Sequence, residues 1–465
     1  MPNSVAMLAL ALWPIVMVTM FARWRLQSAL IWSILAGYMF LPEPPAGFDL
    51  PLLPPVDKHN IPAILAFVFI LYRFGLRGPL LPESKLARIL VFAFVLSPIL
   101  TTATNLNPVA YGNVWLPGMD AKNALAIVVQ QFLMLLPFLL ARQFLAEGGD
   151  QMDLVRAFAI AGLIYSIPML VEIRLSPQLH RWVYGFHQHD FFQTMRFGGW
   201  RPMVFMYHGI WVAFFTLTAL VCAVAMWRST TGAASGRWLA AVVYLAAILI
   251  LAKSLGAILY ALLMLPLLLM LTSRMLLRTA VVLALLATSY PLLKGAGLVP
   301  ETQMLELAAQ IDPDRAGSLQ FRFDQETDLM DRANEKPLFG WGSYARNQFF
   351  DPRTAELVSI TDGRWIIIIG VYGWVGFLAE FGLLMLPLLM LWRLTNRPEG
   401  QQIAATAAPL CLLLAINLVD LLPNSTITPI TWLISGALLG HAERIMALQK
   451  PTVRMPNRIG WRPVM

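Results

Sequence analysis

Charged residues are scarce in this sequence. Asp, Glu, Lys and Arg together make up 13% of its 465 residues, roughly half the share that is usual in a soluble domain. Hydrophobic residues reach 58%, and the mean hydropathy is +0.65. This composition excludes an ordinary soluble protein. The recurring apolar runs of about 20 residues predict membrane-spanning helices, since spanning strands need shorter segments of alternating polarity.

Cysteine is nearly absent as well. Cys222 and Cys411 both lie within apolar runs, so we expect small buried residues and no disulfide framework. His187 and His189 alternate in a loop without further ligands at a metal-binding spacing, and we therefore predict no metal site and no cofactor. Although the net charge is +8, the sequence has no basic patch interleaved with stacking aromatics. This argues against nucleic acid as a partner.

The apolar segments predict an all-α, polytopic transmembrane helix bundle of about 12–13 spans. The candidate spans are residues 5–22, 26–41, 60–74, 86–105, 123–145, 154–173, 203–227, 237–252, 255–272, 277–297, 365–392, 402–422 and 427–446.

The positive charges predict the orientation of these spans. If the N-terminus is outside, every short inside connection is basic, and the short outside connections hold only Lys58, Lys122 and Lys253. This is the bias expected for cytoplasmic connections. The chain then divides into an N-terminal bundle (1–297) with an outer loop at 174–202, a large extracytoplasmic loop containing short helices (298–364), C-terminal transmembrane helices (365–446) and a basic cytoplasmic tail (447–465). We expect the tail to be attracted to anionic lipid.

The first outer loop carries Arg196 and Arg201 around the pair Gly198-Gly199, with His208 at the entry to the next span. A guanidinium group forms two-pronged bonds to phosphate oxygens, so the two arginines are candidates for converging on a phosphate. The alternative is that they contact lipid head groups. His208 is either a hydrogen-bonded core residue or a catalytic group.

The second outer loop carries Arg322 followed by Asp324, Asp328 and Asp331 at near-helical spacing. This pattern predicts a short amphipathic helix lying over the bundle, or alternatively a solvated helix face with weak ion pairs. Further on, Asp362 and Arg364 stand where the loop enters a span. Asp362 is either a base whose pKa is raised by desolvation or the cap of the following helix.

Taken together, these motifs resemble those of the O-antigen ligase and polysaccharide polymerase superfamily, over roughly residues 195–390. The resemblance is carried by Arg201-Pro202 with His208, by Lys253-Ser254-Leu255-Gly256-Ala257, by Arg322 through Pro337-Leu338-Phe339-Gly340-Trp341-Gly342, and by Asp362 followed by Gly373-Trp374-Val375-Gly376. Ligases of this family have a histidine-containing motif before the last of these. In this sequence Asp362 stands at the place of that histidine-containing motif. Family members often have an arginine next to the serine that corresponds to Ser254, whereas here Lys253 lies on the other side of this serine. Both departures favour a polymerase over a ligase.

The resemblance implies glycosyl transfer from an undecaprenyl-diphosphate-linked oligosaccharide to a sugar hydroxyl, without a metal, at the periplasmic face of the bacterial inner membrane. The N-terminus would be periplasmic and the C-terminus cytoplasmic. Asp362 would be the base, with His208 as second candidate. Membrane lipid and a chain-length regulator or export proteins would be further partners. The cations expected to bind substrate are Arg196, Arg201, Lys253, Arg322, Arg332 and Arg364.

Three alternatives stay open at this point. An O-antigen ligase would transfer a finished glycan to a lipid acceptor. A flippase or other transporter of lipid-linked oligosaccharide predicts charges lining the bundle interior and two related halves, and the sequence has no such internal repeat. An assembly subunit without activity predicts that neutralising the outer arginines is harmless.

Overall fold

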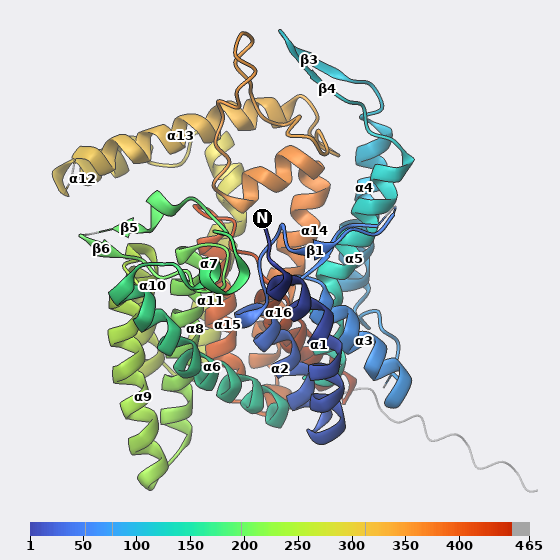
Figure 1. The fold of residues 1–465 in the computed structure, drawn as a ribbon. Coiled ribbons are helices and arrows are strands. Elements are labelled where there is room, and N and C mark those ends of the chain that lie inside the picture. The colour runs from blue at the N-terminus through green and yellow to red at the C-terminus, as the bar shows by residue number, and fades with distance from the viewer. Residues whose placement is uncertain (52, 77, 197, 312, 449–465) are drawn as a thin grey trace, which may run out of the picture.

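The computed structural model describes residues 1–51, 53–76, 78–196, 198–311 and 313–448, and it forms an all-α bundle (Figure 1). All but the first two residues of the predicted tail, 447–465, lie outside the described residues. Eight described helices are long and apolar enough to cross a membrane, as expected for a multi-pass membrane protein. They are α1 (Ser4–Arg23), α4 (Lys85–Ala103), α5 (Ala121–Phe144), α6 (Gly148–Leu175), α8 (Gly209–Ser229), α9 (Gly232–Leu251), α11 (Ser273–Gly295) and α14 (Arg364–Thr395).

Five further described helices fall at the other predicted spans. They are α2 (Leu26–Phe40), α3 (Ile61–Arg73), α10 (Leu255–Met270), α15 (Ala407–Asp420) and α16 (Pro429–Ala447). The predicted boundaries differ most at α6, which begins at Gly148 rather than at residue 154, and at α8, which begins at Gly209 rather than at residue 203. At α8 the reason is local, because the side chain of His208 caps this helix by accepting from the Ile210 N–H.

The core of the bundle is held by close helix pairs, among them α5 with α16 and α11 with α15. Gly436 and Gly440, four residues apart on α16, lie directly against the backbone of Phe138 and Arg142 on α5. A side chain at either glycine would collide with that backbone. Small residues at this spacing are a common way for membrane helices to approach closely.

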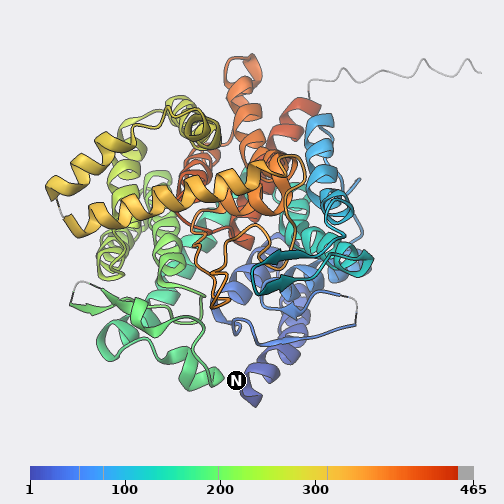
Figure 2. The same cartoon turned by 90° about the horizontal axis from the view of Figure 1, so that it is seen from above.

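The long connections gather at one end of the bundle, which we call the loop face. Seen from above, α12 (Glu301–Ile311) and α13 (Pro313–Asn334) lie across this end (Figure 2). The predicted amphipathic helix is therefore confirmed as a helix, and it is longer than expected. The same face carries α7 (Leu179–Tyr184), the 3-10 turn η1 (Phe191–Thr194) and three small hairpins. These pair β1 (Gly47–Phe48) with β2 (Val56–Asp57), β3 (Val109–Tyr111) with β4 (Val114–Leu116), and β5 (Met195–Arg196) with β6 (Gly199–Trp200).

Helix α14 is broken at Gly373, where φ is +68°. Residues 337–342 of the large loop dock against the break. Trp341 and Gly342 donate their N–H groups to the carbonyls of Gly370 and Val371, while Trp374 donates to Pro337. Backbone groups that leave a helix inside a membrane protein need such partners. The motif at residues 337–342 thus meets the glycine-containing segment around Gly373, and each provides hydrogen-bond partners for backbone groups of the other.

A buried ion pair bridges this break. The Nε of Arg364 lies 2.7 Å from one carboxylate oxygen of Glu380, and one terminal nitrogen lies 2.7 Å from the other. Sixteen residues of a straight α-helix would span about 24 Å, which is too far for these side chains to meet. The pair therefore depends on the change of direction at Gly373.

Candidate functional site

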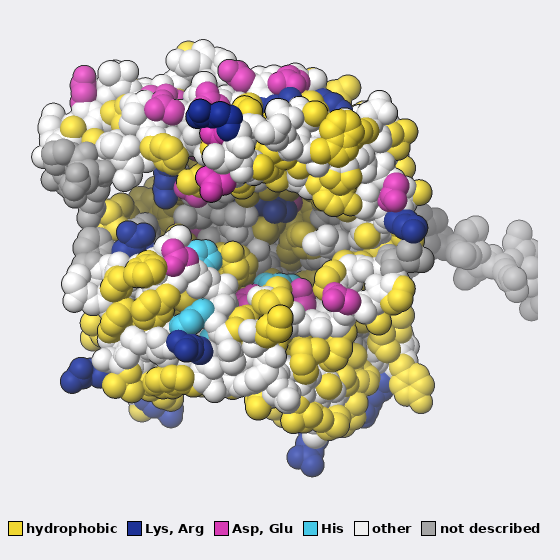
Figure 3. Space-filling model, turned by 45° about the horizontal axis from the view of Figure 1, so that its top comes forward, with side chains coloured by type: hydrophobic (Ala, Val, Ile, Leu, Met, Phe, Trp, Pro, Cys, Tyr) yellow, Lys and Arg dark blue, Asp and Glu magenta, His cyan; other side chains and the backbone are white. Residues whose placement is uncertain are grey.

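All eight site residues predicted from the sequence lie at the loop face. Figure 3 shows this face hollowed by a groove between two bands of surface, with basic, acidic and histidine side chains along it. The residues form separate groups rather than one cluster. Arg322 and Asp362 make the first, Arg196, Arg201, Lys253 and His208 the second, and Arg332 and Arg364 each have buried partners of their own.

Arg322 and Asp362 meet on the wall of a cavity of about 250 Å³, open to solvent at its mouth, which we call the Asp362 pocket. Arg322 Nε lies 3.2 Å from Asp362 Oδ2, and the two side chains are 48% and 42% exposed. Tyr290 and Glu326 also line the pocket, and their side chains are 2.8 Å apart in a hydrogen bond. The pocket therefore combines an apolar wall with an accessible cation and carboxylate.

The backbone around Gly363 fixes where Asp362 lies. The N–H of Arg364 donates to the carbonyls of Leu421 and Asn424 at 2.9 and 3.1 Å, and a side chain at Gly363 would collide with the Leu422 carbonyl. Helix α14 begins at Arg364 with Gly363 at its N-cap position and no side-chain cap. Asp362 is thus not the helix cap, and its carboxylate faces Arg322 instead.

The second group stands where the β5–β6 hairpin meets the turn between α9 and α10. Arg201 is buried and donates to the Lys253 carbonyl at 3.3 Å, and Lys253 Nζ lies 3.3 Å from the Arg196 carbonyl. Burial, with a smaller effect of the nearby Arg196 charge, lowers the pKa of Arg201 to about 10, so it stays a cation at neutral pH. These contacts bring three basic residues into one group, a composition that suits an anionic ligand.

Both ring nitrogens of His208 have partners. Nδ1 accepts from the Ile210 N–H at 3.1 Å, and Nε2 lies 3.2 Å from Gln193 Oε1. Because Nδ1 accepts, the proton is on Nε2. Burial, together with the charges of His189, Arg201 and Arg196, lowers the pKa of His208 to about 3. A helix-capping, neutral histidine accounts for these contacts.

Arg332 and Arg364 are held by the protein itself. The Arg332 guanidinium lies 3.4 Å from the centroid of the Trp341 ring, pairs with Glu335 at 2.6 Å and donates to the Tyr111 hydroxyl. Arg364 is bound by Glu380. The first arginine joins the large loop to the β3–β4 hairpin, and the second stabilises the broken helix.

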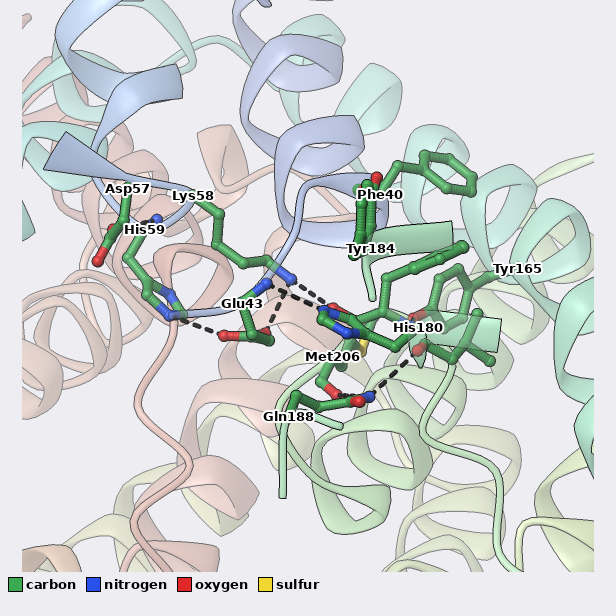
Figure 4. A network of polar contacts seen from close by, with 12 residues as sticks. Phe40, Glu43, Asp57, Lys58, His59, Tyr165, His180, Tyr184, Gln188 and Met206 are labelled. Atoms are coloured by element: carbon green, nitrogen blue, oxygen red, sulfur yellow. Dashed lines mark hydrogen bonds and ion pairs between the residues drawn. The ribbon is translucent and has the colours of Figure 1, made fainter. Parts of the chain in front are cut away.

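A third charged group was not predicted from the sequence. It lies in the connection between α2 and α3, where Glu43 and Lys58 are both fully buried and 2.8 Å apart (Figure 4). The second oxygen of Glu43 lies 3.0 Å from His59 Nε2. Burial raises the pKa of Glu43, but the two cations outweigh it and lower the pKa to about 2. The signal available in the sequence was the run Asp57-Lys58-His59 in a short apolar connection.

The same network joins this connection to the outer loop. His180 accepts from the Glu43 N–H at 3.2 Å, its Nδ1 lies 2.8 Å from the Phe186 carbonyl, and Lys58 donates to the Phe205 carbonyl at 2.6 Å. Burial is the main reason why the pKa of His180 falls to about 4, so the ring is neutral and can accept from the backbone. Hydrogen bonds from the α2–α3 connection to His180 and Phe205 thus fix the two loops to each other.

Replacing Glu43 by glutamine is expected to destabilise the protein strongly. The Lys58 ammonium would remain buried without a counter-charge, which typically costs about 3–5 kcal/mol. The melting temperature in detergent measures the effect. The double variant Glu43→Gln/Lys58→Met removes both charges and should recover much of the loss. A single variant as stable as the parent would contradict this account of the pair.

Comparison with protein-family models and with curated proteins gives no match for this chain. The assignment of a function therefore depends on the geometry of the loop face.

Proposed function

We propose that this protein is a membrane glycosyltransferase that polymerises undecaprenyl-diphosphate-linked oligosaccharide repeat units into exopolysaccharide or O-antigen. In this proposal the loop face is periplasmic and the protein lies in the bacterial inner membrane. The observation that carries the proposal is the pairing of Arg322 with Asp362 in a cavity at the end of a multi-pass bundle. In this arrangement a cation that suits a diphosphate lies directly beside a carboxylate that suits a hydroxyl group.

The reaction requires one bond to form and one to break. The acceptor hydroxyl oxygen attacks the anomeric carbon of the donor sugar, and the bond from that carbon to the diphosphate breaks. Asp362 takes the hydroxyl proton, and the electron pair leaves with undecaprenyl diphosphate. A bound diphosphate competes with Asp362 for the Arg322 guanidinium, which frees the carboxylate to act as a base. The cation then stabilises the charge that develops on the phosphate oxygens.

The cluster of Arg196, Arg201 and Lys253 supports an anionic substrate at the same face. These residues come from a hairpin and an inter-helix turn, and the side chains of Arg201 and Lys253 join the two by donating to the backbone carbonyls of Lys253 and Arg196. Such an arrangement costs repulsion that an anionic ligand relieves. In the proposal, this cluster attracts the lipid diphosphate as it arrives from the bilayer.

Reconstitution tests the proposal. The purified protein in lipid nanodiscs is given an undecaprenyl-diphosphate-linked repeat unit, and the products are separated by size. We expect a ladder whose steps equal one repeat unit. A single addition to a lipid acceptor would instead indicate a ligase, and movement of the donor across the membrane without any new glycosidic bond would indicate a transporter. Either result would overturn the polymerase assignment.

A further inference from the structure

A second cavity lies beside the Asp362 pocket. It has a volume of about 310 Å³, and its walls include His59, Gln130 of α5, Trp211 of α8, Arg364 and Thr428. We call it the His59 pocket. Its volume is within the usual range for sites that bind small molecules. These residues come from five separate parts of the chain, so the cavity exists only in the folded bundle.

Residues that neighbour one another in the chain line the two cavities. Asp362 lines the first and Arg364 the second, with Gly363 between them. The connection between α15 and α16 also contributes to both, through Pro423 on one side and Ser425 on the other. A chain molecule lying in the His59 pocket is therefore next to the Arg322–Asp362 pair.

The chemistry of the His59 pocket differs from that of the Asp362 pocket. Its only described arginine, Arg364, already forms a two-pronged pair with Glu380, and Asp57 adds a carboxyl group to the wall. The remaining polar wall consists of amide, hydroxyl and imidazole groups, from Asn60, Gln130, Ser425, Thr428 and His59. Such groups suit the hydroxyls of an uncharged ligand better than a diphosphate, and the Trp211 indole provides a flat apolar surface.

The His59 side chain is held in place by Glu43 and Trp211. Its Nε2 lies 3.0 Å from Glu43, and Glu43 is fixed in turn by Lys58 (Figure 4). The imidazole also packs edge-on against Trp211, with 6.3 Å between the ring centroids. The side chain nevertheless stays 34% exposed. Burial lowers the pKa of His59, but the Glu43 carboxylate outweighs burial and raises it overall. An imidazole that is oriented on one side and accessible on the other is suited to binding a ligand.

We propose that the His59 pocket is a saccharide-binding site that holds the uncharged sugars at the growing end of the acceptor glycan. His59 and Gln130 hydrogen-bond to sugar hydroxyls, and Trp211 packs against the apolar face of a sugar ring. This inference rests on the proposed function, because it assigns the acceptor to one cavity and the donor diphosphate to the other.

Binding of a free oligosaccharide tests the site without catalysis. The probe is the oligosaccharide released by partial hydrolysis of the source strain's polysaccharide, titrated calorimetrically into the full-length protein in nanodiscs. His59→Gln and Gln130→Leu should each weaken binding about ten-fold, the effect of roughly one lost hydrogen bond in a dry site. His187→Gln, a matched loop histidine outside the pocket, and Arg322→Ala should bind like the parent. Melting temperatures of all four variants establish that they are folded.

The outcomes separate this inference from the proposed function. If the parent does not bind the probe, or if both pocket variants bind it as tightly as the parent, the saccharide site is overturned even where polymer is formed. If Arg322→Ala weakens binding as much as His59→Gln, the separation of the two cavities is wrong. If the probe binds as expected but no polymer is formed from the lipid-linked unit, the saccharide site stands and the proposed function falls.

Discussion

Arg322→Ala is expected to slow polymerisation by on the order of 100-fold, the usual consequence of losing one group that stabilises charge in a transition state. On gels, high-molecular-weight polymer should disappear. The fold should survive, because the Arg322–Asp362 pair is half exposed and such pairs contribute only about 0–1 kcal/mol to stability. Ladder formation by the reconstituted variant measures the rate, and the melting temperature measures the fold.

Arg353→Ala is the matched control, since Arg353 is an exposed arginine of the same large loop. It should form polymer at the parent's rate. If Arg322→Ala also makes polymer of normal length and at the parent's rate, its assigned role at the diphosphate is wrong.

Asp362→Asn separates the two members of the pair. Asparagine keeps the size of the side chain but cannot take a proton, so kcat should fall about 100-fold, within the range for loss of a general base. The KM for the donor should change little, because Arg322 is still present. Asp328→Asn, on an exposed part of α13, should behave like the parent. A variant of Asp362 in which donor binding alone suffers would show that the carboxylate is not the base.

Gly373→Ala is expected to destabilise the protein strongly. A side chain at φ +68° costs about 1–2 kcal/mol, and the new methyl group would collide with the Leu338 backbone. Residues 337–342 would have to move away from α14 and release their backbone hydrogen bonds, each worth about 1 kcal/mol. We expect a total loss on the order of 4 kcal/mol, seen as a lower melting temperature and as faster proteolysis of the large loop.

Gly236→Ala provides the comparison for this variant. Gly236 lies in α9, and an added methyl group there meets no group of the described residues within 4 Å. Its stability should equal or slightly exceed that of the parent, because alanine favours helices over glycine. If the two alanine variants melt at the same temperature, the contact at the break in α14 does not stabilise the fold.

The helices of this protein could be predicted from its sequence, because length and hydropathy are local properties. The same was true of α13, whose row of acidic residues at helical spacing indicated an exposed face. Asp362 and Arg322 were each identified as site candidates for local reasons. Their pairing was not predicted, because it depends on how a loop helix lies across the bundle.

The features that were missed all depend on segments far apart in the chain. Glu43 and His180 are 137 residues apart, and nothing in the sequence around either residue indicates the other. The break in α14 was hidden because residues 365–392 form one long, mostly apolar segment, and Gly373 within it could equally have been a tolerated helix residue. Only the docking of residues 337–342 shows why a glycine is needed there.

The break in α14 also resolves a mismatch of length. A straight helix of 32 residues would be about 48 Å long, whereas the hydrocarbon layer of a bilayer is about 30 Å thick. Such a rod would have to tilt steeply or distort the surrounding lipid. By turning at Gly373, the chain fits one of its longest apolar segments to the thickness of the membrane. The first turns of α14, before the break, then lie beneath the large loop.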